Sequence, residues 1–139
     1  MKSLLVAPLL FAVAASAAAA PSPQPSVTLH GKRFSTELAT TDATRERGLM
    51  MRTELAADHS MLFVFPDTAE RWFWMKNTLI PLDIIFIRSD GTIVRVTKAQ
   101  ALSLEPLPAG EPISLVLEIA GGRAAELGIK EGDVASWTH

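Results

Sequence analysis

Short apolar runs separated by turn-forming residues are the feature of this sequence that most constrains its fold. The clearest runs cover residues 61–65, 82–88, 93–98 and 113–119. Each is shorter than a typical helix, is rich in β-branched or aromatic residues, and ends near Pro, Gly or Asp, as strands do. The Asp90-Gly91 step is the strongest hairpin signal, because a type I′ turn needs positive φ at both central residues. The sequence therefore predicts a mainly β structure.

Weaker signals fill the rest of the chain. Strand-like runs are also expected at residues 27–30, 33–39, 70–76 and 134–137. Thr41 or Asp42 is a suitable N-cap for a short helix over residues 43–49, and residues 121–127 hold one or two further helical turns. Residues 101–112 are rich in Pro and are expected to form an irregular surface loop. Because strands do not alternate with helices, we predict an antiparallel β-sandwich or partly open barrel of about eight short strands with two short helices.

Residues 1–20 have the layout of a secretory signal peptide. Lys2 is their only charge, an apolar run follows, and small residues suited to cleavage end the segment. The apolar run is too short to span a bilayer comfortably, since a spanning helix needs about 20 residues. Residues 21–26 alternate Pro with small polar residues and are expected to be an extended spacer, followed by a single globular β domain over residues 27–139. We therefore expect an exported protein, periplasmic or extracellular, that is not held in the membrane after cleavage.

Composition argues against several classes of function. The net charge is −2 and the 13 basic residues are scattered, so neither nucleic acid nor an anionic membrane is an expected partner. The chain has no Cys, which excludes disulfides and thiol catalysis. Its three His residues lack the spacing of a metal site, and there is no glycine-rich phosphate loop. We expect no metal and no cofactor, while the oligomeric state is left open.

Residues 72–88 combine aromatic, polar and apolar side chains in a way that marks a candidate site. They hold two of the three Trp residues, a Lys76-Asn77 step, and Asp83 beside a long apolar run. A carboxylate next to a buried strand is costly unless it is paired or solvated. Asp83 therefore either joins Trp74, Lys76 and Asn77 in a ligand pocket with the indole as a stacking platform, or fixes the architecture by capping the preceding turn or binding an arginine.

Three more charged residues belong to the candidate ligand-binding set. Arg45 and Arg52 lie on and just after the first predicted helix, where forked guanidinium groups are able to clamp a carboxylate or phosphate. Alternatively, one of them meets Asp83 or Glu118 and fastens the helix to the sheet. Glu118 lies within an apolar run and so repeats the problem of Asp83. If the two acids face one cleft, they form a candidate acid/base pair of the glycosidase type.

A series of short motifs runs in order through nearly all of the chain that follows the predicted signal peptide. The series consists of Arg45, Gly48, Leu49, Met50 and Arg52; residues 61–65; residues 73–78; Pro81 and Asp83; Leu117 and Glu118; and Gly132 and Asp133. It resembles the domain of unknown function 192 family. The resemblance implies a compact, mostly antiparallel β domain of bacteria and archaea, often exported, with no agreed activity. Ser60 departs from the pattern, since the family more often has Gly there; if that position needs a positive φ, Ser60 is strained.

Three classes of function remain open. A small-ligand binding module for a sugar-like or anionic metabolite predicts a preformed hollow near Trp74, Lys76, Asn77 and Asp83. A hydrolase-type enzyme predicts Asp83 and Glu118 in one water-accessible cleft, with at least one pKa raised by desolvation. An accessory interaction domain of the cell envelope predicts an apolar patch or an open sheet edge. We favour the binding module, because polar residues alternate with aromatic ones and no activated nucleophile or other catalytic signature is visible.

Overall fold

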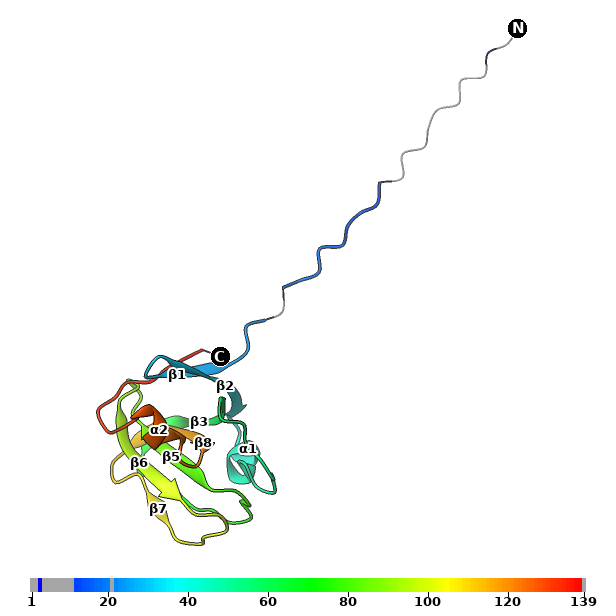
Figure 1. Cartoon of the computed structure of the whole chain (residues 1–139). Helices are drawn as coiled ribbons and strands as arrows, with labels where there is room; N and C mark the ends of the chain where they lie inside the picture. Colours follow the sequence, from blue (N-terminus) through cyan, green and yellow to red (C-terminus); the bar gives the residue numbers. More distant parts are fainter. Residues whose placement is uncertain (1–2, 4–11, 21, 139) are drawn as a thin grey trace.

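The computed structural model describes residues 3, 12–20 and 22–138 (Figure 1). Residues 12–20 of the predicted signal peptide are exposed and have no helix or strand, and the rest of it except Ser3 lies outside the described residues. None of the described helices is long and apolar enough to cross a membrane. The elements in chain order are β1 (Ser26–Leu29), β2 (Lys32–Ala39), α1 (Asp42–Arg47), β3 (His59–Ala69), β4 (Trp72–Phe73), β5 (Leu82–Ile87), β6 (Ile93–Ala99), β7 (Leu107–Pro108), β8 (Ile113–Ala120), α2 (Arg123–Leu127) and β9 (Ser136–Thr138).

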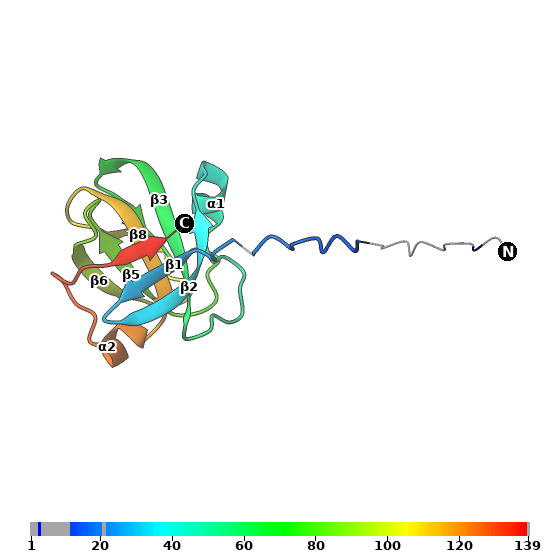
Figure 2. The same cartoon turned by 90° about the horizontal axis from the view of Figure 1, so that it is seen from above.

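Seven of the strands form one strongly curled sheet, seen from above in Figure 2. Their order is β6-β5-β8-β3-β2-β1-β9. The two ends of this order meet again at one corner, where an antiparallel bridge joins Thr92 to Val134 and the Ala135 N–H donates to the Gly91 carbonyl oxygen at 2.8 Å. Gly91 has a φ of +93°, and a Cβ there would overlap the Ala135 carbonyl oxygen, so this corner requires glycine. The fold is therefore the mainly β, partly open barrel that the sequence predicts.

One strand pair departs from the predicted antiparallel arrangement. β2 and β3 pair in parallel, with Ser35 opposite His59 and Ala39 opposite Phe63. Parallel neighbours need a crossover connection, and here the crossover contains α1. Because α1 has only 6 residues, it does not produce the long strand–helix alternation by which a parallel pair is recognised in a sequence. Its N-cap is Thr41, one of the two predicted candidates.

The chain after Phe63 also differs from the prediction. β3 continues through Pro66 to Ala69, and a register shift between Val64 and Ala69 removes the need for the N–H that proline lacks. The strand predicted over residues 70–76 is reduced to β4. It pairs with β7, inside the loop predicted to be irregular, as a separate two-stranded sheet.

Ser60 carries none of the strain that the family pattern raised as a concern. It lies within β3 and is not among the residues with a positive φ. Its side chain is fully buried, and its hydroxyl forms a hydrogen bond of 2.8 Å with Thr36 Oγ1. A serine at this position is therefore accommodated as an ordinary strand residue with a polar partner.

The central strands β5 and β8 are buried on both faces and separate two apolar cores. One core contains Ile85, Ile87, Leu117 and Ile119, and the other contains Ile84, Phe86 and Val116. Successive side chains of a strand point to opposite faces of the sheet, so neighbours in the sequence contribute to different cores. This alternation decides where the buried acids of these strands point.

Candidate functional site

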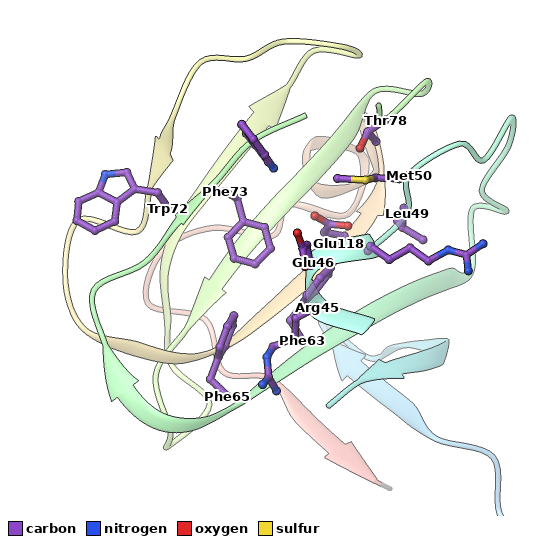
Figure 3. A pocket seen from close by; sticks show the side chains of 13 residues that line it. Arg45, Glu46, Leu49, Met50, Phe63, Phe65, Trp72, Phe73, Thr78 and Glu118 are labelled. Atoms are coloured by element: carbon purple, nitrogen blue, oxygen red, sulfur yellow. The ribbon is translucent and has the colours of Figure 1, made fainter. Parts of the chain in front are cut away.

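A cavity of about 260 Å³ lies beside the second core, between α1, β3 and the segment that contains β4. Its lining comprises Arg45, Glu46, Arg47, Gly48, Leu49, Met50, Phe63, Phe65, Trp72, Phe73, Trp74, Thr78 and Glu118. Figure 3 shows Glu46, Met50 and Glu118 converging on one space with the Phe73 ring beside it. The cavity therefore combines a largely aromatic wall with carboxyl groups, the mixture found in small-molecule sites.

Glu118 is the polar group at the inner end of this cavity. Strand pairing sets it opposite Met61 on one side and Ile84 on the other, so its side chain points to the face of the second core. It is only 5% exposed, and within the described residues its carboxyl group makes no hydrogen bond or ion pair. Burial raises the pKa of Glu118 to about 8, because the charged form loses its hydration. At neutral pH this side chain is therefore mostly a neutral acid that faces a cavity without a partner.

The aromatic wall is fixed by ring packing. Phe73 makes edge-to-face contacts with Phe63, Phe65 and Phe86 at ring-centroid distances of 5.1, 6.3 and 5.8 Å. Such contacts hold each ring in one orientation. Although β4 is short, this packing attaches it firmly to the main sheet and fixes this part of the cavity wall.

Asp83 lies on the other face of the sheet from Glu118. Residue 84, not Asp83, pairs with Glu118, so the two acids do not share a cleft and do not form an acid/base pair. Asp83 is 1% exposed, and its Oδ2 accepts a hydrogen bond of 2.8 Å from the Ala124 N–H at the start of α2. Asp83 therefore does fix the architecture, but it caps α2 rather than the preceding turn or an arginine.

Neither predicted arginine meets Asp83 or Glu118. Nη1 of Arg45 donates to the carbonyl oxygens of Thr40 and Val64, both at 2.7 Å, and Nη2 donates to Asp42 at 2.7 Å. Arg45 thus fastens α1 to β3 through a main-chain carbonyl instead of through an acid. Its guanidinium also lies 5.3 Å from the centroid of the Phe65 ring, away from Glu118 (Figure 3).

Arg52 lies outside the cavity and holds β2 to the loop after α1. Its two terminal nitrogens donate to both carboxylate oxygens of Glu37, one of them at 2.8 Å, and His59 Nε2 lies 3.0 Å from the same carboxylate. The hydrogen bonds from Arg52, with a smaller contribution from His59, lower the pKa of Glu37 to about 2 against the opposing effect of burial. The cluster of Glu37, Arg52 and His59 is therefore a structural ion pair, and the Arg52 guanidinium is already occupied by Glu37.

Replacing Glu37 with glutamine is expected to lower the free energy of unfolding by at most about 1 kcal/mol, because the pair is partly exposed and screened by water. The Glu37 carboxylate has a lower pKa in the folded chain, so its stabilisation is present above about pH 4.5 and is lost as the pH falls toward 2. Urea denaturation at acidic and neutral pH measures this. The variant should lose part of the acid dependence seen in the parent, and an unchanged dependence would contradict the assignment.

Trp74, Lys76 and Asn77 follow one another around the cavity mouth. Trp74 lines the cavity and is 50% exposed, which confirms an accessible indole. The Lys76 ammonium lies 5.1 Å from the centroid of the Trp74 ring, and with Asn77 it lines an adjoining outer hollow rather than the cavity itself. Asn77 has a φ of 55°, and its carbonyl oxygen accepts from the Met51 N–H at 2.8 Å. Of the seven predicted site residues, three line the cavity: Arg45, Trp74 and Glu118. Lys76 and Asn77 stand at its rim, whereas Arg52 and Asp83 lie elsewhere.

Several cavity residues were not predicted from the sequence. Glu46 and Arg47 are ordinary helix residues there, and Met50 and Phe73 are ordinary core candidates. The parallel crossover that lays α1 beside β4 brings them together, and no spacing along the chain records that contact. Among the described residues, no group of three or more His, Cys, Asp or Glu side chains is placed to hold a metal ion.

The curled sheet and its cavity define a small β-barrel-like domain whose cavity is lined by aromatic rings and has an acid at its inner end. The chain belongs to the domain of unknown function 192 family, whose model, described as an uncharacterized ACR, matches residues 25–137. No curated protein shows a significant sequence match to it.

Two solved structures are similar over most of the chain. A protein from Sinorhizobium meliloti 1021, described as a "putative transcription regulator", is 38% identical with a TM-score of 0.77, over 81% of this chain and 91% of that one. A protein of unknown function from Novosphingobium aromaticivorans DSM 12444 is 44% identical with a TM-score of 0.73, over 89% of this chain and 94% of that one. These relatives share the fold, and their descriptions assign no ligand.

Proposed function

We propose that this protein is a small-ligand binding module and that its site is the cavity between α1, β3 and β4. The observation that carries the proposal is Glu118, a buried carboxyl that has no partner among the described residues and faces a preformed aromatic cavity. An unpartnered buried polar group reduces stability, and a ligand that satisfies it recovers that free energy as affinity. We also propose, from residues 1–20, that the chain is exported and acts outside the cytoplasm.

The chemical class predicted from the sequence, a sugar-like or anionic metabolite, is only partly supported. A ring-shaped ligand fits the exposed Trp74 indole and the cavity wall. The anionic alternative relied on Arg45 and Arg52, and both guanidinium groups are already bound within the protein. Nor is the paired-acid enzyme supported, because Asp83 and Glu118 lie on opposite faces of the sheet.

A second candidate, an accessory interaction domain, rests on exposed apolar side chains near the cavity mouth. Trp72 is 59% exposed and Leu104 is 66% exposed, and both border a shallow hollow beside β4. Large exposed apolar side chains that gather in one place mark interaction sites in many proteins. If a Leu104→Ser variant still binds the small ligand, this exposed surface is not required for ligand binding in the cavity.

A thermal-shift screen of the purified domain against sugars, amines, carboxylic acids and nucleotides tests the binding module. A ligand that binds only the folded state raises the melting temperature by mass action. For any compound that does so, Trp74→Ala is expected to weaken the affinity about tenfold, because loss of ring contact costs roughly 1.4 kcal/mol. Isothermal titration calorimetry measures this change.

The matched control is Val134→Ala, which shortens an exposed apolar side chain at the corner where the barrel closes. It should leave the affinity unchanged. If no compound in the screen shifts the melting temperature, or if every hit binds Trp74→Ala as tightly as the parent, the proposed site is wrong.

A further inference from the structure

Resting on the proposed binding function, we infer that the ligand is a small organic cation that carries an N–H group, such as a protonated amine, bound between Glu118, Glu46 and the aromatic wall. Two acids, Glu46 and Glu118, and two arginines, Arg45 and Arg47, line the cavity. Figure 3 shows the Glu46 and Glu118 side chains directed into the same space, while the Arg45 guanidinium lies beside Phe65.

The positive charges of α1 are placed so that they do not oppose such a ligand. Arg45 is held by two carbonyl oxygens and by Asp42. Arg47 is exposed and also lines two outer hollows. The other elements around Glu118 present uncharged side chains: Met61 and Phe63 from β3, Ile84 from β5, and Phe73, Trp74 and Thr78 from the segment that contains β4. An entering ammonium therefore meets the side chains of Glu46 and Glu118, while the Arg45 guanidinium is already paired and Lys76 stands at the rim over Trp74.

The rings of this region already bind the protein's own cations. The Arg71 guanidinium lies 3.8 Å from the centroid of Phe65, and the Lys76 ammonium lies 5.1 Å from the centroid of Trp74. A cation over an aromatic face is attracted by the negative charge of the ring surface, most strongly where water is excluded. Phe65 and Trp74 line the cavity together with Phe63, Trp72 and Phe73, so a cation bound there would be surrounded by aromatic rings.

Binding of an ammonium group has a distinct signature, because Glu118 must ionise to pair with it. The empty site holds the Glu118 proton at neutral pH, since burial raises the pKa of this group to about 8. The arriving cation stabilises the carboxylate and releases the proton to solvent. Affinity should therefore rise up to about tenfold per pH unit below pH 8 and level off above it, and close to one proton should leave for each ligand bound at neutral pH.

Three probes of one shape and different charge test the inference: benzylamine, benzyl alcohol and benzoate. Isothermal titration calorimetry of the whole folded domain in two buffers of different ionisation enthalpy gives both the affinity and the number of protons released. We expect benzylamine to bind at least tenfold more tightly than benzyl alcohol, to bind with proton release, and to be favoured by rising pH, with benzoate weakest. Glu118→Gln should reduce benzylamine affinity at least tenfold and abolish proton release, whereas Glu131→Gln, at an exposed acid near the C-terminus, should change neither.

The possible failures are distinguishable. If benzyl alcohol, benzoate or a sugar binds in this cavity better than benzylamine, or if affinity does not depend on pH, the cation inference is overturned and the binding function stands. If benzylamine binds Glu118→Gln as tightly as the parent, Glu118 is not its anchor and the inference is again overturned. Failure of all three probes rejects the amine class, and only failure of the wider thermal-shift screen rejects the binding module.

Discussion

Raising the pH from about 4.5 to about 8 is expected to lower the free energy of unfolding by about 1.4 kcal/mol per pH unit, because of the buried carboxyl group of Glu118. Burial raises the pKa of Glu118 from 4.5 to about 8. Between these values the carboxyl is ionised in the unfolded chain and protonated in the folded one. The folded state thus binds more protons than the unfolded state. The stability that protonated Glu118 allows is fully present below pH 4.5 and is lost as the pH rises toward 8.

Chemical denaturation at several pH values across this range measures the slope. Glu118→Gln keeps the shape of the side chain and removes its proton, so the variant should show a much flatter curve and should be more stable than the parent near pH 8. Glu131→Gln serves as the control, because this acid is exposed and its removal should leave the slope in place. Parallel curves for the parent and Glu118→Gln would show that Glu118 is hydrated in the folded protein.

Replacing Asp83 with alanine is expected to lower the free energy of unfolding by about 2–3 kcal/mol. Its Oδ2 accepts the Ala124 N–H at 2.8 Å, and the N-cap residue of α2 is Gly122, which has no side chain to take over that role. The variant leaves this buried N–H without an acceptor, and leaving a buried donor unpaired costs more than an average hydrogen bond contributes.

Urea denaturation of Asp83→Ala gives the loss directly, and hydrogen exchange at the Ala124 amide shows whether α2 opens. Asp42→Ala is the matched control: it removes an acid from the first turn of the other helix, where the side chain is exposed and forms only a surface ion pair with Arg45, and should cost about 1 kcal/mol or less. Parent-like stability for Asp83→Ala would mean that the cost of burying its second, unpaired oxygen cancels the capping bond.

Glu118 and Asp83 are expected to affect the stability of the fold in opposite directions, because their environments differ. Both are acids inside apolar strands, and both look alike in the sequence. Asp83 accepts a hydrogen bond from the Ala124 N–H, so it stabilises the fold, whereas Glu118 has no donor in the part of the chain that the structure describes and faces a cavity. A group that reduces stability at the proposed site fits the general compromise between stability and function.

Local patterns predicted most of the strands because strand formation depends on alternation and turn chemistry over a few residues. The Asp90-Gly91 hairpin joins β5 to β6 as expected, although only Gly91 has a positive φ, so the turn is not the type I′ turn that the Asp-Gly step suggested. Residues 113–119 form β8 almost to the residue. The same reasoning missed β7 and the extension of β3 beyond Pro66. Proline argues against a strand locally, and only a pairing partner from elsewhere in the chain reverses that preference.

The sequence by itself determined the β class, the position of the Asp90-Gly91 hairpin, the family, and the presence of two acids within apolar strands. Only the tertiary structure decided that Asp83 caps α2, that Arg52 binds Glu37, and that Glu118 faces an aromatic cavity with Glu46. The physical reason is that a strand's period of two tells which residues share a face but not what lies across from that face. That is set by strand order and by the parallel crossover through α1, which depend on contacts between distant parts of the chain.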